Sequence, residues 1–185
     1  MEYPIIPGLC SIFKGVEKEV YANISIHRIL HLIKSESYRA EINELRTHQT
    51  LFRTRYEKGK TKLLSFTPVG RYYLTRRTEN LISLSKMIVL DFDEVYDVKK
   101  VKEEAIKLPY TLCCFISPSG KGLKILVKGI FQTTSEYKKM YSLATQVYTK
   151  ALGYEVDYAS DPTRLCFLSS DKELYWNPNS ICINY

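Results

Sequence analysis

The segment Met87-Ile88-Val89-Leu90-Asp91-Phe92-Asp93 decides the fold, because its length and apolar composition are typical of a strand buried in a core. Side chains alternate along a strand, so Asp91 and Asp93 share one face at a separation of about 6 to 7 Å. Leu90 and Phe92 point the other way, into the core. The segment therefore predicts a core strand that ends in a pair of carboxylates.

Regular elements are expected on both sides of this strand. The spacing of apolar residues predicts helices at Val98–Lys107 and Thr134–Leu152, and Pro68 and Gly70 indicate that Lys62–Arg77 is a hairpin with an exposed tip. Further core strands are expected at Tyr110–Ile116, Leu123–Val127 and Arg164–Leu168. Only one connection clearly has the length of a β-α-β unit. We therefore expect an α+β fold in which a mainly antiparallel sheet is flanked by helices.

The N-terminal third of the chain is expected to add a segment of strand and helix. Tyr3–Lys14 predicts an extended arm that ends in a short strand. Ser25–Arg46 has the apolar spacing of one helix or two, with an interruption at 35–37. We expect a single domain, in which residues 1–61 form the arm and the helical part and residues 62–185 form the core.

The composition limits the class of protein. With 185 residues, of which 45% are hydrophobic, the chain is long enough to bury one core. Its five cysteines form no CxxC pair, so neither a disulfide framework nor a zinc ribbon is indicated, and a reducing, cytoplasmic location is expected. Residues 1–30 lack the pattern of a leader peptide. No stretch approaches the roughly 20 apolar residues of a membrane span, so we expect no membrane partner.

The net charge of +7 is concentrated in one stretch, residues 46–77, where the only acid is Glu57. The basic residues there are Arg46, Arg53, Arg55, Lys58, Lys60, Lys62, Arg71, Arg76 and Arg77. A local basic surface attracts phosphate backbones, although a solvated surface would have the same composition. The aromatic residues among these charges, which could stack on bases or fill a core, are Phe52, Tyr56, Phe66, Tyr72 and Tyr73.

The carboxylate pair Asp91 and Asp93 suggests a metal site. Two carboxylates on one strand face repel each other unless a cation lies between them, and Mg²⁺ and Mn²⁺ prefer such oxygen ligands. Two-metal sites hold ions about 3.5 to 4 Å apart, which such a pair can bridge. Alternatively, the two acids simply face solvent or pair with Lys86 or Lys99.

A Ser-Pro-Ser-Gly-Lys-Gly turn separates two of the expected strands. Its glycines permit a tight turn, and its hydroxyl and ammonium groups are donors that suit a polyphosphate. It is not a Walker A loop, which requires GxxxxGK[ST] followed by a helix. An ordinary hairpin turn would have the same residues. The candidates for nucleotide binding are Ser117, Ser119, Gly120, Lys121, Gly122 and Lys124.

A third polar segment, Glu155–Arg164, leads into the last expected strand. Asp157 could supply a third carboxylate ligand, and Arg164 could hold a triphosphate. A turn before Pro162 with a surface ion pair explains the same residues equally well. The combination of the three segments is more specific than any one of them.

The ordered motifs LDFD, SPSGKGLKILV and VDYASDPTRLCFLS, within the region from about Lys62 to Pro178, resemble the N-terminal domain of VirE-type, virulence-associated mobile-element proteins. That domain is regarded as a member of the archaeo-eukaryotic primase superfamily. The resemblance extends more loosely upstream and so covers most of the chain. It implies a primase-like catalytic core and Mg²⁺ or Mn²⁺ as cofactor.

The resemblance also implies roles for single residues. Asp91 and Asp93 match the first motif of the superfamily, two acids that bind the catalytic metals, and Asp157 matches the acid of the third motif. Gly122-Leu123-Lys124 stands where the superfamily has small-x-His, so Lys124 can meet a phosphate only as a point charge. Arg164 resembles the phosphate-binding arginine of related primase-polymerases.

The leading hypothesis is a DNA primase/polymerase of a mobile element or phage-like system that acts on a DNA template and primer with nucleoside triphosphates. The resemblance implies a helicase-like ATPase as a further partner. One alternative is a nucleic-acid-binding module of the same fold that has lost turnover with the missing His. Another is a phosphohydrolase of the haloacid dehalogenase type, because an apolar strand that ends in DxD also marks that family.

Overall fold

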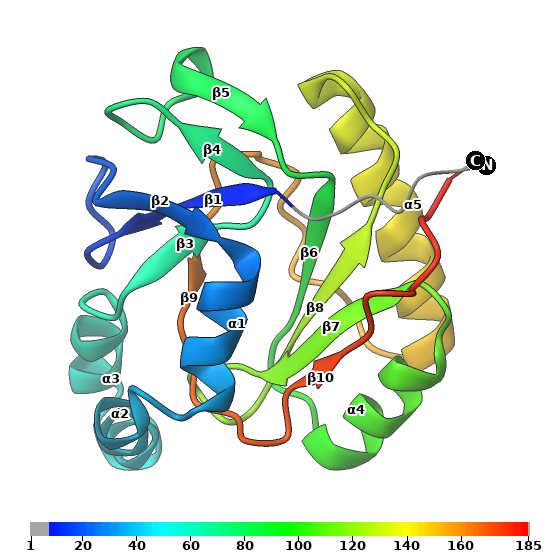
Figure 1. Cartoon of the computed structure of the whole chain (residues 1–185). Coiled ribbons are helices and arrows are strands. Elements are labelled where there is room, and N and C mark those ends of the chain that lie inside the picture. Colours follow the sequence, from blue (N-terminus) through cyan, green and yellow to red (C-terminus); the bar gives the residue numbers. More distant parts are fainter. Residues whose placement is uncertain (1–7, 185) are drawn as a thin grey trace.

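The computed structural model describes residues 8–184 and shows an α+β fold in which antiparallel sheets are flanked by helices (Figure 1). The first sheet has the strand order β2-β1-β3-β9, and every neighbouring pair is antiparallel. Its strands are β1 (Leu9–Phe13), β2 (Ala22–Ser25), β3 (Ser65–Thr67) and β9 (Cys166–Phe167). Strands from the beginning and the end of the chain thus share one sheet.

The second sheet has the order β10-β7-β8-β6 and is also antiparallel throughout. Its strands are β6 (Met87–Phe92), β7 (Thr111–Ile116), β8 (Leu123–Lys128) and β10 (Tyr175–Trp176). The register between β6 and β8 places Asp91 directly opposite Lys124. A separate ribbon is formed by β4 (Gly70–Tyr72) and β5 (Leu81–Leu84), which follows a short 3-10 turn, η1 (Thr78–Asn80).

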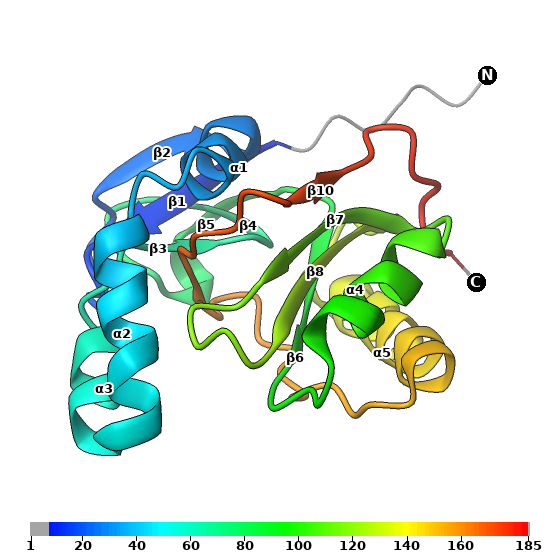
Figure 2. The same ribbon diagram turned by 90° about the horizontal axis from the view of Figure 1, so that it is seen from below.

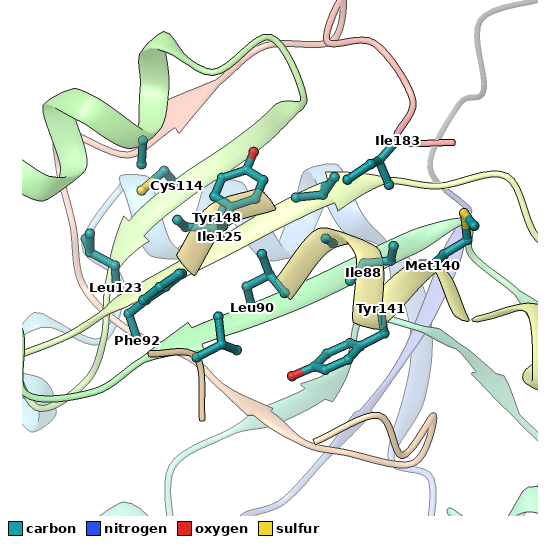
Figure 3. Packing of buried hydrophobic residues seen from close by; sticks show 14 of the residues in the cluster. Ile88, Leu90, Phe92, Cys114, Leu123, Ile125, Met140, Tyr141, Tyr148 and Ile183 are labelled. Carbon is teal, nitrogen blue, oxygen red and sulfur yellow. The ribbon is translucent and has the colours of Figure 1, made fainter. Parts of the chain in front are cut away.

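Both faces of the second sheet are covered, which explains why β6 is apolar for most of its length. On one face, Ile88, Leu90 and Phe92 pack against α5 (Thr134–Leu152), which lies beside α4 (Val98–Lys107) (Figure 3). On the other face, Met87 and Val89 belong to a second core with α1 (Ile26–Lys34) and the first sheet. Asp91 is on this second face, so its carboxylate lies between the sheets.

The remaining helices, α2 (Arg39–Leu51) and α3 (Arg53–Lys60), form a pair at one end of the molecule, as Figure 2 shows. Their small core consists of Ile42, Leu45, Tyr56 and Leu63. Gly59 permits the close approach, because a Cβ there would lie 2.8 Å from the Leu45 side chain. The two helices are therefore held together by a small core of their own, in which Tyr56 is buried.

Several predictions from sequence are confirmed. The helices at Val98–Lys107 and Thr134–Leu152 have the predicted bounds, and the second begins in a capping box of Thr133 and Glu136. The expected helical segment after Ser25 is two helices, interrupted at 35–38. The predicted arm over residues 3–7 lies outside the described residues, and the short strand after it is β1. Within residues 8–184, no helix has both the length and the apolar character that a membrane span requires.

One prediction is wrong, and another is confirmed only in part. Lys62–Arg77 is not a hairpin, because β3 pairs within the first sheet whereas β4 pairs with β5, and the turn at 68–70 that was expected to be exposed is buried. The strand expected at Arg164–Leu168 shrinks to Cys166–Phe167, and β10 follows it. Arg164 therefore lies in the loop before β9.

Candidate metal centre between the two sheets

Three carboxylates converge at the end of β6. Asp91 is in the strand, Asp93 follows it directly, and Asp157 lies in the loop after α5. Each offers one oxygen, and these oxygens all lie within 4.8 Å of one another. The backbone N–H of Asp157 donates to the carbonyl oxygen of Asp91 at 2.8 Å, which pins the loop to the strand. Acids that are 66 residues apart in the sequence thus form one cluster.

Asp91 is the buried member of the cluster, with 7% of its surface exposed. Its Oδ2 accepts hydrogen bonds from Lys124 and Arg164, the second at 3.4 Å. Its Oδ1 is also buried but has no hydrogen-bond partner. Leaving a buried acceptor unpaired typically costs about 1 to 3 kcal/mol. The orphaned oxygen therefore favours the binding of a ligand at this point.

Two cations already balance part of the negative charge. Lys124 reaches Asp91 from the neighbouring strand, and Arg164 contacts both Asp91 and Asp157. Burial has the largest single effect and lowers the pKa of Lys124, but the charge and the hydrogen bond of Asp91, together with other nearby groups, raise the pKa above its usual value. Burial likewise has the largest single effect on Arg164 and opposes its charged form, but the hydrogen bond to Asp157 and the charges of Asp157 and Asp91 together raise its pKa.

Asp93 faces solvent at the rim of the cluster. Partial desolvation raises its pKa, and the charge of Asp91 raises it further, whereas Lys124 and Lys60 act in the opposite direction. Burial and like charge thus both disfavour the ionised form of Asp93. A cation bound between Asp93 and Asp91 would relieve that repulsion.

The donor set fits a hard divalent ion. Three carboxylates with an unpartnered buried oxygen match the oxygen ligands that Mg²⁺ and Mn²⁺ prefer. Any such ion has to compete with the ion pairs that Lys124 and Arg164 already make. The expected alternative partners of the acids, Lys86 and Lys99, make no ion pair with them within residues 8–184.

The turn at 117–122 is held against the end of β6. Ser117 N–H donates to the carbonyl of Gly122 at 2.9 Å, and Gly120 N–H donates to the carbonyl of Ser117 at 2.9 Å. Gly120 has a φ of 77°, which favours glycine. Gly122 has no room for a side chain, because a Cβ there would collide with the carbonyl oxygen of Phe92. The glycines thus serve a tight turn that closes against the site.

Arg46 supports this turn from α2. Its guanidinium donates to the carbonyls of Ser117 and Pro118, both at 3.3 Å, and to that of Ser170 at 3.2 Å. Burial lowers the pKa of Arg46, and Asp171 and Glu36 act against that shift. The side chain is therefore engaged in structure, although its position in the basic stretch suggested a surface residue.

The other basic residues do not form one surface. Arg53 and Lys60 line a pocket beside Asp93, whereas Arg55, Lys58 and Lys62 line a different groove. The β4–β5 ribbon, with the remaining three arginines, lies at the other end of the molecule in Figure 1. There Arg71 lies on β4, Arg76 donates to the carbonyl of Thr163 at 2.9 Å and Arg77 pairs with Glu79.

The aromatic residues of the basic stretch are divided between the core and the surface. Tyr56, Phe66 and Tyr72 are buried, so the core interpretation holds for these three. Phe52 and Tyr73 are exposed by 51% and 62%. Only these two remain available for stacking on bases.

Sequence reasoning did not single out Tyr141. Its hydroxyl accepts from the N–H of Ala159 at 3.0 Å and donates to the carbonyl of Asp157 at 3.4 Å, so it shapes the loop that carries the third acid. The only sequence signal is that Tyr141 falls on the buried face of α5. A polar tip on a core aromatic needs a partner, and here that partner is the site loop.

Comparison with known proteins gives one match. No curated protein matches the chain, and no solved structure does. Residues 58–176 match the family of the BT4734-like, N-terminal domain, a different family from the VirE-type domain that the three motifs resemble. The matched region contains all three acids, the 117–122 turn and Arg164, and it spans well over half of the sequence. The chain therefore belongs to the BT4734-like N-terminal domain family.

Proposed function

We propose that the protein is a metal-dependent nucleotidyltransferase, a DNA primase/polymerase that adds nucleotides to a primer on a template. The observation that carries this proposal is the convergence of Asp91, Asp93 and Asp157 with a buried, unpartnered oxygen among them. The order of the three motifs and the antiparallel sheet that carries the first two support a primase-like core.

Each group has a distinct task in this proposal. The three acids would hold Mg²⁺ or Mn²⁺, and such an ion would lower the pKa of a primer 3′-hydroxyl and offset the charge on the leaving pyrophosphate. Arg164 is placed to bind phosphate oxygens through its guanidinium fork. Lys124, once released from Asp91, offers a point charge to the same phosphates. Tyr141 and the backbone bond from Asp157 keep the third acid in position.

Primer extension tests the proposal directly. The assay combines a labelled primer-template, all nucleotides and either Mn²⁺ or Mg²⁺. Asp91→Asn and Asp157→Asn should abolish extension, because each keeps the side-chain volume and removes a charged ligand. Glu155→Gln is the matched control, since it removes an exposed acid two residues from Asp157 that is not part of the cluster. Absence of extension by the wild type with either metal would refute the proposal.

A second candidate is a nucleic-acid-binding module without turnover. The observation in its favour is that Lys124 and Arg164 already pair with the acids, so the site is largely neutralised without any ion. This candidate predicts that the wild type binds primed DNA but neither extends it nor binds Mn²⁺ more tightly than Asp91→Asn does.

A further inference from the structure

A pocket of about 310 Å³ lies between α3 and Asp93, the one of the three acids that lines it. One wall is helix α3, with Arg53 and Lys60. The 117–122 turn contributes Ser119 and Lys121, and the end of β6 contributes Asp93. The lining is mostly polar, which disfavours a nucleobase and favours a charged ligand. The pocket thus joins the basic stretch to the candidate metal centre.

Helix α3 presents two faces with different surroundings. Arg53 and Lys60 are seven residues apart, which is about two helical turns, so they lie on one face and both line this pocket. Arg55 and Lys58 line a separate groove against α2. One short helix therefore carries two pairs of cations that can be tested against each other.

Tyr56, the one buried residue of α3, fixes the position of this helix. Tyr56 is buried, and a side-chain hydrogen bond with Ser119 opposes the rise in the pKa of Tyr56 that burial causes. Lys60 lies 5.8 Å from the centre of the Phe167 ring, and its charge acts on the carboxylate of Asp93. Lys60 is thus held toward Asp93, and Arg53 lines the same pocket from the first turn of the helix.

The charges of the pocket are mixed. Lys121 joins Arg53 and Lys60 as a third cation, but Glu57, Asp93 and Glu94 also line the pocket. A free polyanion would gain attraction from one set and repulsion from the other. A polyphosphate that carries a divalent ion suits both, because the ion faces carboxylates while the phosphate oxygens face cations.

We infer that this pocket binds the metal-chelated polyphosphate of the incoming nucleotide, and that Arg53 and Lys60 contact its phosphate oxygens. The inference rests on the proposed function and gives it a substrate site. It also separates Arg53 and Lys60 from Arg55 and Lys58, which the sequence alone grouped as one surface for nucleic acid.

Calorimetric binding of inorganic tripolyphosphate tests this inference without any turnover. The wild type should bind tripolyphosphate in the presence of Mn²⁺ and much more weakly with EDTA. The double variant Arg53→Gln/Lys60→Met should bind about tenfold more weakly or worse, because two charge-assisted contacts are lost. The control Arg55→Gln/Lys58→Met makes the same change in net charge on the other face and should stay within about twofold of the wild type. Circular dichroism checks that both variants keep their helices.

The outcomes separate the two claims. Equal losses of tripolyphosphate affinity in both double variants would show that only net charge matters. An undiminished affinity in Arg53→Gln/Lys60→Met would place the polyphosphate elsewhere. Either result overturns the inference. Undiminished binding of tripolyphosphate in EDTA would overturn the claim that the bound polyphosphate carries a metal ion. If the wild type extends primers while the pocket variant keeps its nucleotide KM, the inference fails and the proposed function stands. If tripolyphosphate binding discriminates the variants but no extension occurs, the proposed function fails and the pocket stands.

Discussion

Replacing Lys124 by Met removes an ammonium group from a buried ion pair and keeps most of the aliphatic stem. The side chains of Lys124 and Asp91 are exposed by only 9% and 10%, so neither charge can turn to water. Removing one partner of such a pair typically costs about 3 to 5 kcal/mol. Arg164 stays 3.4 Å from Asp91, which favours the lower value. Each kcal/mol lowers the melting temperature of a chain of this size by about 2 to 4 °C, so the metal-free variant should melt roughly 6 to 12 °C lower.

Divalent metal should restore most of this loss. In the wild type an ion competes with Lys124 for Asp91, whereas in the variant the ion takes over the role of the ammonium. An ion present at 100 times its Kd adds about 2.7 kcal/mol, which nearly cancels the lost pair. Mn²⁺ should therefore raise the melting temperature of Lys124→Met more than that of the wild type. Calorimetry should show a lower Kd for Mn²⁺ in the variant.

Lys128→Met is the matched control. Lys128 lies on the same strand and is buried, but its ammonium donates to the carbonyl of Pro178 at 3.1 Å and makes no ion pair within the described residues. This control should lose stability without any change in Mn²⁺ affinity. Identical Mn²⁺ affinities in the wild type and Lys124→Met would refute the reasoning, because Lys124 would then not be the counter-ion that the metal displaces.

Three further predictions concern buried groups and a tight turn of the fold. Asp171→Ala should lower the free energy of unfolding by about 3 to 5 kcal/mol in urea titrations, because it breaks the buried pair with Lys102; an unchanged midpoint would contradict this. Gly122→Ala should lower the melting temperature and weaken tripolyphosphate binding, since the added Cβ collides with Phe92, and unaltered values would show that the turn can move away. Burial raises the pKa of the thiols of Cys10, Cys114 and Cys166 to about 12, and that of Cys113 well above its usual value. At pH 8, iodoacetamide should therefore label these four cysteines only after the protein is unfolded. Mass spectrometry of the labelled protein checks this.

The elements with strong local signals were predictable from sequence. The strand at Met87–Phe92 follows from an apolar run of the right length, and α5 follows from its spacing and its capping residues. The hairpin at Lys62–Arg77 was predicted from the same kind of signal and is wrong. Pro68 and Gly70 do mark a change of direction, but the strands that flank it join different sheets. Which partner a three-residue strand pairs with is decided by tertiary packing, which a local pattern does not contain.

The candidate site was likewise predictable only where local pattern decides it. The alternation rule placed Asp91 and Asp93 on one side of β6, but it could not show that this side faces another sheet, so the burial of Asp91 was not predicted. The ion pair with Lys124 depends on the register between β6 and β8, which only the fold defines. The division of α3 into two faces was not predicted either, because no helix was expected at Arg53–Lys60; only once the helix is known does the seven-residue spacing place Arg53 and Lys60 on one face.

The strand order of the first sheet limits how far the chain can be shortened. The family match begins at residue 58, yet β1 lies between β2 and β3, and α1 covers one face of the second sheet. A fragment cut at the family boundary would leave β3 with an open edge and would expose the core that surrounds Met87 and Val89. It would also lack the arginine that braces the 117–122 turn. The smallest unit suitable for expression therefore starts well upstream of the region that defines the family.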